Sequence, residues 1–96
     1  RISGRLVTNI KERSQTEILS DIRAIAGVTI VSTDEIQDYS EQRRGRFISV
    51  LNLKVDGFPY MKSGFDRDTI IKIADKVRRV PNVISFKYNP EDIQPI

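Results

Sequence analysis

The stretch that decides the fold is "SDIRAIAGVTIVS", residues 20–32, because "DKVRRVPNVISFK", residues 75–87, repeats its layout 55 positions later. In each copy an apolar helical stripe ends at a corner, and a short run rich in β-branched residues follows. The shift places Gly27 on Asn82 and Val28 on Val83. Glycine ends a helix in a left-handed conformation without a Cβ penalty, so the corner stops the helix and turns the chain. The sequence therefore predicts two copies of one strand–helix–strand unit.

The remaining elements are predicted outward from these corners. Ser14-Gln15-Thr16-Glu17 fits a capping box and begins the first helix, and Asp66 or Asp68 can cap the second, which Pro81 ends. A polar stretch over 34–45 and a glycine- and proline-containing stretch over 56–66 read as loops. The predicted order is strand, helix, strand, strand, helix, strand, over residues 2–11, 14–27, 28–33, 46–55, 66–80 and 83–88.

These elements predict an α+β fold of the ferredoxin-like βαββαβ type. In each half, the second strand is expected to pair with the first strand of the same half through a right-handed crossover. Both helices should cover one face of a four-stranded antiparallel sheet. We expect the domain to span residues 1–89, with residues 90–96 as a C-terminal tail.

Composition excludes several classes of function. The chain has 96 residues, enough for one domain, and its 16 basic and 13 acidic side chains leave a net charge of only +3. It contains no His and no Cys, so the usual general base, thiolate nucleophile and commonest metal ligands are missing. No apolar run approaches the about 20 residues of a membrane span. We expect a soluble, non-enzymatic domain without cofactor or metal, intracellular or virion-borne by default.

Two resemblances accompany this pattern. The corner "RAIAGVTIVS" resembles that of the amino-acid-binding ACT domains, which implies a small-ligand regulatory role, although residues 12–16 lack the glycine that such domains carry before the first helix. Over most of the chain, "ILSDIRAIAGVTIVS", "ISVLNLKVDG" and "IADKVRRVPNVISF" are similar to small ferredoxin-like proteins of unknown role encoded by tailed phages. This second resemblance implies the fold and carries over no functional residue.

The main functional prediction is an apolar contact surface. If the helices pack on the Leu6, Ile30, Leu51 and Leu53 side, the opposite sheet face should expose Val7, Val31, Ile48 and Val50. Such patches mark interfaces, although the tail or the long loop can also cover them. The loop residues Phe58, Tyr60 and Met61 form a second candidate contact. The sequence thus predicts a protein–protein interaction or assembly module that self-associates or docks into a larger complex through the open face or an edge strand.

Two alternatives stay open. A nucleic-acid-binding module would use surface arginines, namely Arg43, Arg44, Arg46, Arg78 and Arg79. The same charges also fit a solvated face or local ion pairs. Base stacking on the third strand is disfavoured, because Arg46 and Ile48 stand where an RNA-recognition domain carries aromatic rings. The third reading is the ACT-like regulator that binds a small ligand.

Overall fold

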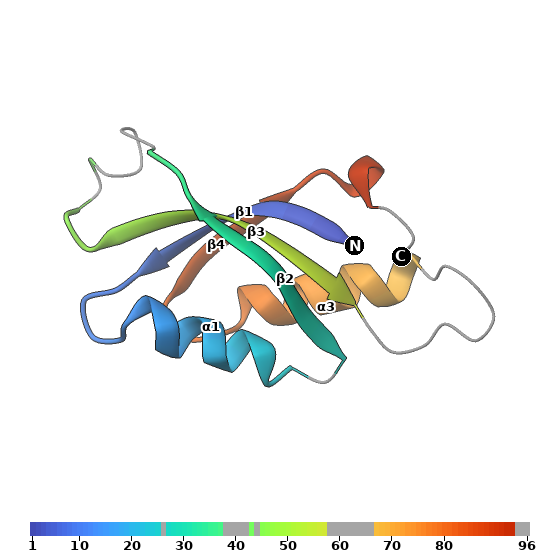
Figure 1. Cartoon of the computed structure of the whole chain (residues 1–96), viewed down its shortest axis with the longest axis horizontal. Coiled ribbons are helices and arrows are strands. Elements are labelled where there is room, and N and C mark those ends of the chain that lie inside the picture. Colours follow the sequence, from blue (N-terminus) through green and yellow to red (C-terminus); the bar gives the residue numbers. More distant parts are fainter. Residues whose placement is uncertain (26, 38–42, 44, 58–66, 94–96) are drawn as a thin grey trace.

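The computed structural model describes residues 1–25, 27–37, 43, 45–57 and 67–93, which form one twisted sheet and two helices (Figure 1). The elements are β1 (Ile2–Asn9), α1 (Gln15–Arg23), β2 (Val28–Glu35), β3 (Ile48–Gly57), α3 (Arg67–Arg78), β4 (Val83–Tyr88) and the 3-10 turn η1 (Pro90–Asp92). The four strands are antiparallel in the order β2-β3-β1-β4. Both helices lie on the same side of the sheet (Figure 1), so the predicted ferredoxin-like α+β fold is confirmed.

The predicted pairing within each half is wrong. β1 and β3 pair with each other at the centre, while β2 pairs with β3 and β4 pairs with β1. A helix with its side chains is about 10–12 Å across, roughly twice the 4.7–4.9 Å strand spacing. The crossover through each helix therefore leaves room for one strand, and the first strand of the other half fills it. The two halves interlock instead of lying side by side.

The repeated corner is confirmed at the level of single hydrogen bonds. Gly27 and Asn82 both have positive φ, 84° and 71°. Beside them, Val28 N–H donates to the Ile25 carbonyl and Val83 N–H donates to the Val80 carbonyl, each at 3.1 Å. The two halves of the chain therefore leave their helices through the same turn.

Several element ends differ from the prediction. β2 runs on to Glu35, β3 begins only at Ile48, and α1 ends at Arg23. Ser14 is the N-cap of α1, as predicted, and its Oγ accepts the Glu17 N–H at 3.2 Å. α3 begins at Arg67, which places Asp68 in its first turn, while Asp66 lies outside the described residues.

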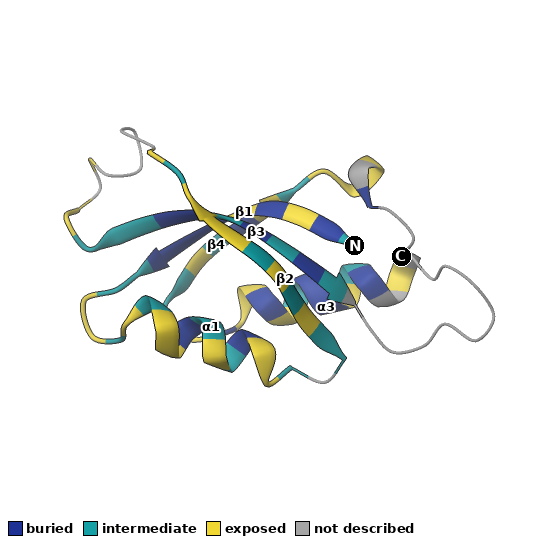
Figure 2. Ribbon diagram, viewed as in Figure 1, coloured by how far each residue is buried: buried dark blue, intermediate teal, exposed yellow. Residues whose placement is uncertain are grey.

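The core lies between the helices and the inner face of the sheet, where α1 contributes Ile18 and Ile22. Figure 2 shows buried and exposed residues alternating over the first five residues of β1, whereas Val7 and Thr8 further along are both buried. Phe86 packs across Gly4, where a Cβ atom would lie only 2.7 Å from the ring. Ile93, in the segment predicted as a tail, is 8% exposed and belongs to this core. Within the described residues no helix has both the length and the apolarity to cross a bilayer.

Candidate interaction surfaces

Two residues of the predicted apolar patch are buried. Val7 and Val50 are only 2% and 4% exposed, so the expectation that they lie open to solvent is wrong. They stand directly opposite each other on the two central strands, and both lie outside the main core cluster. A residue on a central strand has neighbours on both sides, which leaves little of a valine side chain uncovered. The open face therefore has no broad apolar centre among the described residues.

Exposed apolar side chains occur instead at a bulge on each edge strand. Val31, predicted for the patch, is 41% exposed and has no partner, because Ile30 pairs with Val55 and Ser32 pairs with Lys54. On β4 the pairing likewise passes over Ile84, which is 39% exposed. Neither strand contains a glycine or a proline, the residues that commonly mark a bulge, so the sequence does not signal either one. Bulges of this kind limit continuous strand addition along an edge.

A shallow hollow lies where β2 and β3 extend beyond the core. Its volume is about 140 Å³, and its lining includes Ile10, Ile36, Ile48 and Val50 together with Glu35. Ile36 is held against β3 by its N–H, which donates to the Val50 carbonyl at 3.0 Å. Ile36 and Ile48 are both half-buried. The two patch residues Ile48 and Val50 thus line a hollow rather than a flat surface.

The predicted arginines that the structure describes make different contacts. Arg43 and Arg46 are exposed, and the Arg46 guanidinium lies 4.8 Å from the centroid of the Phe47 ring. Phe47, which lies within the predicted strand over 46–55, precedes β3 and also has Lys11 Nζ at 6.0 Å from its ring centroid. Cations at these distances stabilise an aromatic ring that stays half-exposed. Arg44, Phe58, Tyr60 and Met61 lie outside the described residues.

Arg78 makes contacts within the domain. Its Nε donates to the Phe86 carbonyl at 2.9 Å, its Nη1 lies 3.1 Å from Asp75, and its guanidinium lies 5.1 Å from the Tyr88 ring centroid. These contacts join α3 to β4. Arg79, its neighbour, is exposed.

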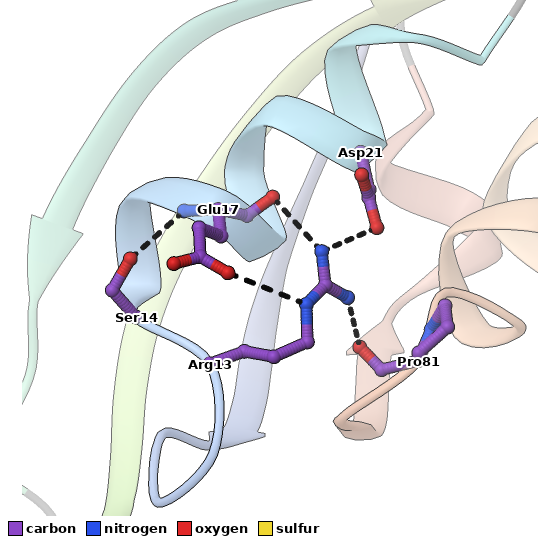
Figure 3. A network of polar contacts seen from close by, with 5 residues as sticks. All are labelled: Arg13, Ser14, Glu17, Asp21 and Pro81. Carbon is purple, nitrogen blue, oxygen red and sulfur yellow. Dashed lines mark hydrogen bonds and ion pairs between the residues drawn. The ribbon is translucent and has the colours of Figure 1, made fainter.

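Arg13 joins the two halves of the repeat (Figure 3). Its guanidinium donates to the Pro81 carbonyl at 3.2 Å and to Asp21 Oδ2 at 2.5 Å, and Glu17 Oε2 lies 3.8 Å from its Nε. One side chain thereby links the start of α1 to the corner before β4. The sequence carries no signal for this role, because Arg13 and Pro81 are 68 positions apart.

Basic residues on the open face were also missed from sequence. Arg5 pairs directly across the sheet with Lys87 on one side and with Asn52 on the other, and Lys54 is two residues beyond Asn52. The neighbouring residues Leu6, Leu53 and Phe86 belong to the core, so these three cations share the opposite face. Because side chains alternate between the two faces of a strand, the sequence could have predicted which face each cation lies on. Only the register brings the three together.

An ion pair lies at one end of this face. Arg1 Nε donates to Asp56 Oδ1 at 2.8 Å, and the Arg1 Nη2 reaches the other carboxylate oxygen at 3.2 Å. The hydrogen bond from Arg1 lowers the pKa of Asp56 below its ordinary value, although burial acts in the opposite direction. The Asp56 charge is therefore already matched within the domain.

Comparison of the chain with models of known protein families and with curated proteins gave no match. A ferredoxin-like fold hosts many unrelated functions, so the fold alone assigns none to this chain.

Proposed function

We propose that this domain is a non-enzymatic protein–protein interaction module, which docks into a larger assembly by binding an extended, basic segment of a partner protein along β2. The observation that supports it best is the outer edge of β2, which pairs only with β3 in the described chain and adjoins the hollow. An extended segment can add to a free strand edge through main-chain hydrogen bonds, while pockets select its side chains.

The bulge at Val31 sets where such a segment binds. Because strand pairing is interrupted there, an added segment pairs with regular backbone on one side of the bulge at a time, and on the C-terminal side that backbone runs from Ser32 to Glu35. The hollow lies beside this end of β2. Its volume of about 140 Å³ has room for one partner side chain, although the hollow is open to solvent and its exposed lining is more polar than apolar. Ile10, Ile36 and Ile48 supply the apolar part of that lining, and we expect an apolar side chain of the partner to contact them.

Charge favours a basic partner. Asp34 and Glu35 are both exposed at the end of β2, and the described part of the chain supplies neither with an ion-pair partner. Rim charges of this kind steer association and set register more than they add affinity. We therefore expect a Lys or Arg on either side of the apolar anchor.

Selection of a displayed library of random peptides on the immobilised domain tests this proposal. We expect the recovered peptides to carry one apolar residue flanked by Lys or Arg. Ile36→Lys should weaken their binding at least tenfold, because it removes apolar lining at the anchor site, and tenfold is about 1.4 kcal/mol. Glu35→Lys should weaken it several-fold, and more at low salt. Ile36→Ala serves as a second lining variant if the lysine substitution disturbs folding.

The control for Glu35→Lys is Glu91→Lys, which makes the same charge change at an exposed position on η1. Sedimentation equilibrium over a concentration series reports in parallel whether the chain binds copies of itself, and Ile36→Lys should abolish any such association. Peptides that bind Ile36→Lys and Glu35→Lys as well as the unaltered chain would refute the β2 site. Recovery of no peptide, together with a monomer at every concentration, would refute the module itself.

A further inference from the structure

We propose that the outer edge of β4 is a second strand-accepting surface, which can pair with β4 of another copy of this chain, and that Arg78 keeps this edge closed. β4 lies at the opposite edge of the sheet from β2. Pairing through β4 therefore does not depend on the partner site proposed along β2.

The hydrogen bonds beside β1 show which backbone groups of β4 face outward. Ile10 N–H donates to the carbonyl of Phe47, the residue that leads into β3. Backbone groups of successive residues in a strand point to opposite sides, so Leu6, an even number of residues before Ile10, also points toward β3. Phe86 is the partner of Leu6 on β4, and the two form a pair without mutual hydrogen bonds. The Phe86 N–H and carbonyl therefore face the outer edge of the sheet.

The Arg78 guanidinium occupies this outward carbonyl. Its Nε donates to the Phe86 carbonyl at 2.9 Å, and the guanidinium lies 5.1 Å from the Tyr88 ring centroid, so it stands along the edge of the strand. Asp75 Oδ1, 3.1 Å from the Arg78 Nη1, orients the group. An added strand would have to place its own N–H where Nε already donates, and it would bury a charged side chain that is 44% exposed. Strand addition at β4 is opposed as long as Arg78 makes this contact.

The edge formed by β2 has similar backbone but no such cap. Each edge strand has a bulge and a regular segment beyond it, over residues 32–35 on β2 and 85–88 on β4. Ile36 N–H donates toward β3, to the Val50 carbonyl, so the backbone of Glu35 just before it points outward. Among the described residues, none donates from its side chain to the Glu35 carbonyl. Arg78 thus makes β4 the closed edge and leaves β2 as the open one.

A second copy of β4 is the strand that suits this edge. Two identical edges pair antiparallel about a twofold axis, and with the axis at Phe86 its outward groups bond the same groups of the other copy. Ile84, which is 39% exposed, then lies opposite Tyr88 of the other copy. An aliphatic β-branched residue and an aromatic ring make a favourable cross-strand pair. Lys87 lies opposite Ser85, so like charges do not meet directly.

Sedimentation equilibrium of Arg78→Met over a concentration series tests this proposal. Methionine keeps an unbranched stem beside Tyr88 and suits a helix, but it cannot donate to the Phe86 carbonyl. We expect the mean mass to rise with concentration toward twice the 11.0 kDa of one chain, whereas the unaltered chain should show no association through β4. Circular dichroism reports whether the variant is folded, and Arg78→Ala replaces it if methionine disturbs folding.

Two matched controls separate the cap from other effects of the substitution. Arg79→Met removes the same charge at the exposed neighbouring residue, and its mass should equal that of the unaltered chain. Asp75→Asn removes the ion pair with Arg78 but leaves the Nε contact to Phe86 possible, so its mass should also be unchanged.

Three further substitutions, each added to Arg78→Met, locate the association. Ile84→Lys places a lysine on the β4 edge and should restore the monomer, because edge lysines oppose strand pairing. Val31→Lys makes the same change at the exposed bulge residue of β2 and should leave the dimer intact. Ile36→Lys should also leave it intact, so failure of the β2 site and failure of pairing through β4 are separable.

Folded Arg78→Met and Arg78→Ala variants that stay monomeric at every concentration would overturn the proposal. Equal association of Arg79→Met would also overturn it, since loss of charge alone would then explain the effect. Association that survives Ile84→Lys would lie elsewhere on the chain and would reject the β4 edge. An unaltered chain that already pairs, and that Ile84→Lys returns to the monomer, would show that Arg78 does not close this edge.

Discussion

Replacing Asn82 by Ala should destabilise the domain more than replacing it by Gly. Asn82 has a φ of 71°, in the left-handed region that costs an ordinary residue about 1–2 kcal/mol. A glycine at this position avoids that cost, but it makes the unfolded chain more flexible, which reduces its advantage by about 0.5–1 kcal/mol. The difference leaves Asn82→Ala about 1 kcal/mol less stable than Asn82→Gly. The Asn82 carbonyl, which accepts the Asn9 N–H at 2.9 Å, is kept in both variants, so the comparison isolates the backbone conformation.

Urea unfolding followed by circular dichroism measures this difference, and in thermal melts it corresponds to about 4–8 °C for a domain of this size. The control pair is Lys72→Ala and Lys72→Gly on the exposed side of α3. There the order should invert, because Ala is favoured over Gly inside a helix by about 1 kcal/mol. Gly27→Ala, at the equivalent corner, should be destabilising for the same reason as Asn82→Ala. An Asn82→Ala variant at least as stable as Asn82→Gly would refute the argument from φ.

Three further outcomes are expected. Val50→Arg should lower the free energy of unfolding in urea by about 3 kcal/mol or more, because Val50 is only 4% exposed. A loss below about 0.5 kcal/mol, as expected for a surface position, would contradict its burial. Lys87→Glu should raise the stability of the domain by about 0.2–1 kcal/mol, because it replaces a like-charge cross-strand pair with Arg5 by an opposite one; a lower melting temperature would argue against repulsion between these two positions. Asp56→Asn should destabilise the domain near neutral pH, because Arg1 lowers the pKa of Asp56 in the folded state and the stabilisation exists only while the carboxylate is ionised. The difference between Asp56→Asn and the unaltered chain should shrink as pH falls below about 4, and a difference that does not change with pH would show that the charge is not responsible.

The features predicted correctly from sequence depend on residues close together in the chain. The Ser14 cap, the left-handed corner at Gly27 and the bounds of β4 each follow from a few consecutive side chains and the conformations they prefer. The repeat then implied two equivalent units, because the same local pattern produces the same turn wherever it occurs. Even Asn82 was assigned to its corner through its alignment with Gly27.

The tertiary structure decided which strands are neighbours and what each side chain meets. Alternation along a strand assigns Val7 and Val50 to one face, but their burial depends on standing opposite each other on the two central strands. The pairing of Arg5 with Lys87 likewise follows from register between segments about 80 residues apart. The alternation of side chains between two faces depends on one strand alone, whereas burial and charge pairing depend on which other residues the fold places beside that strand. The sequence by itself therefore determined the elements and their corners, and the packing of the two halves determined the surfaces available for binding.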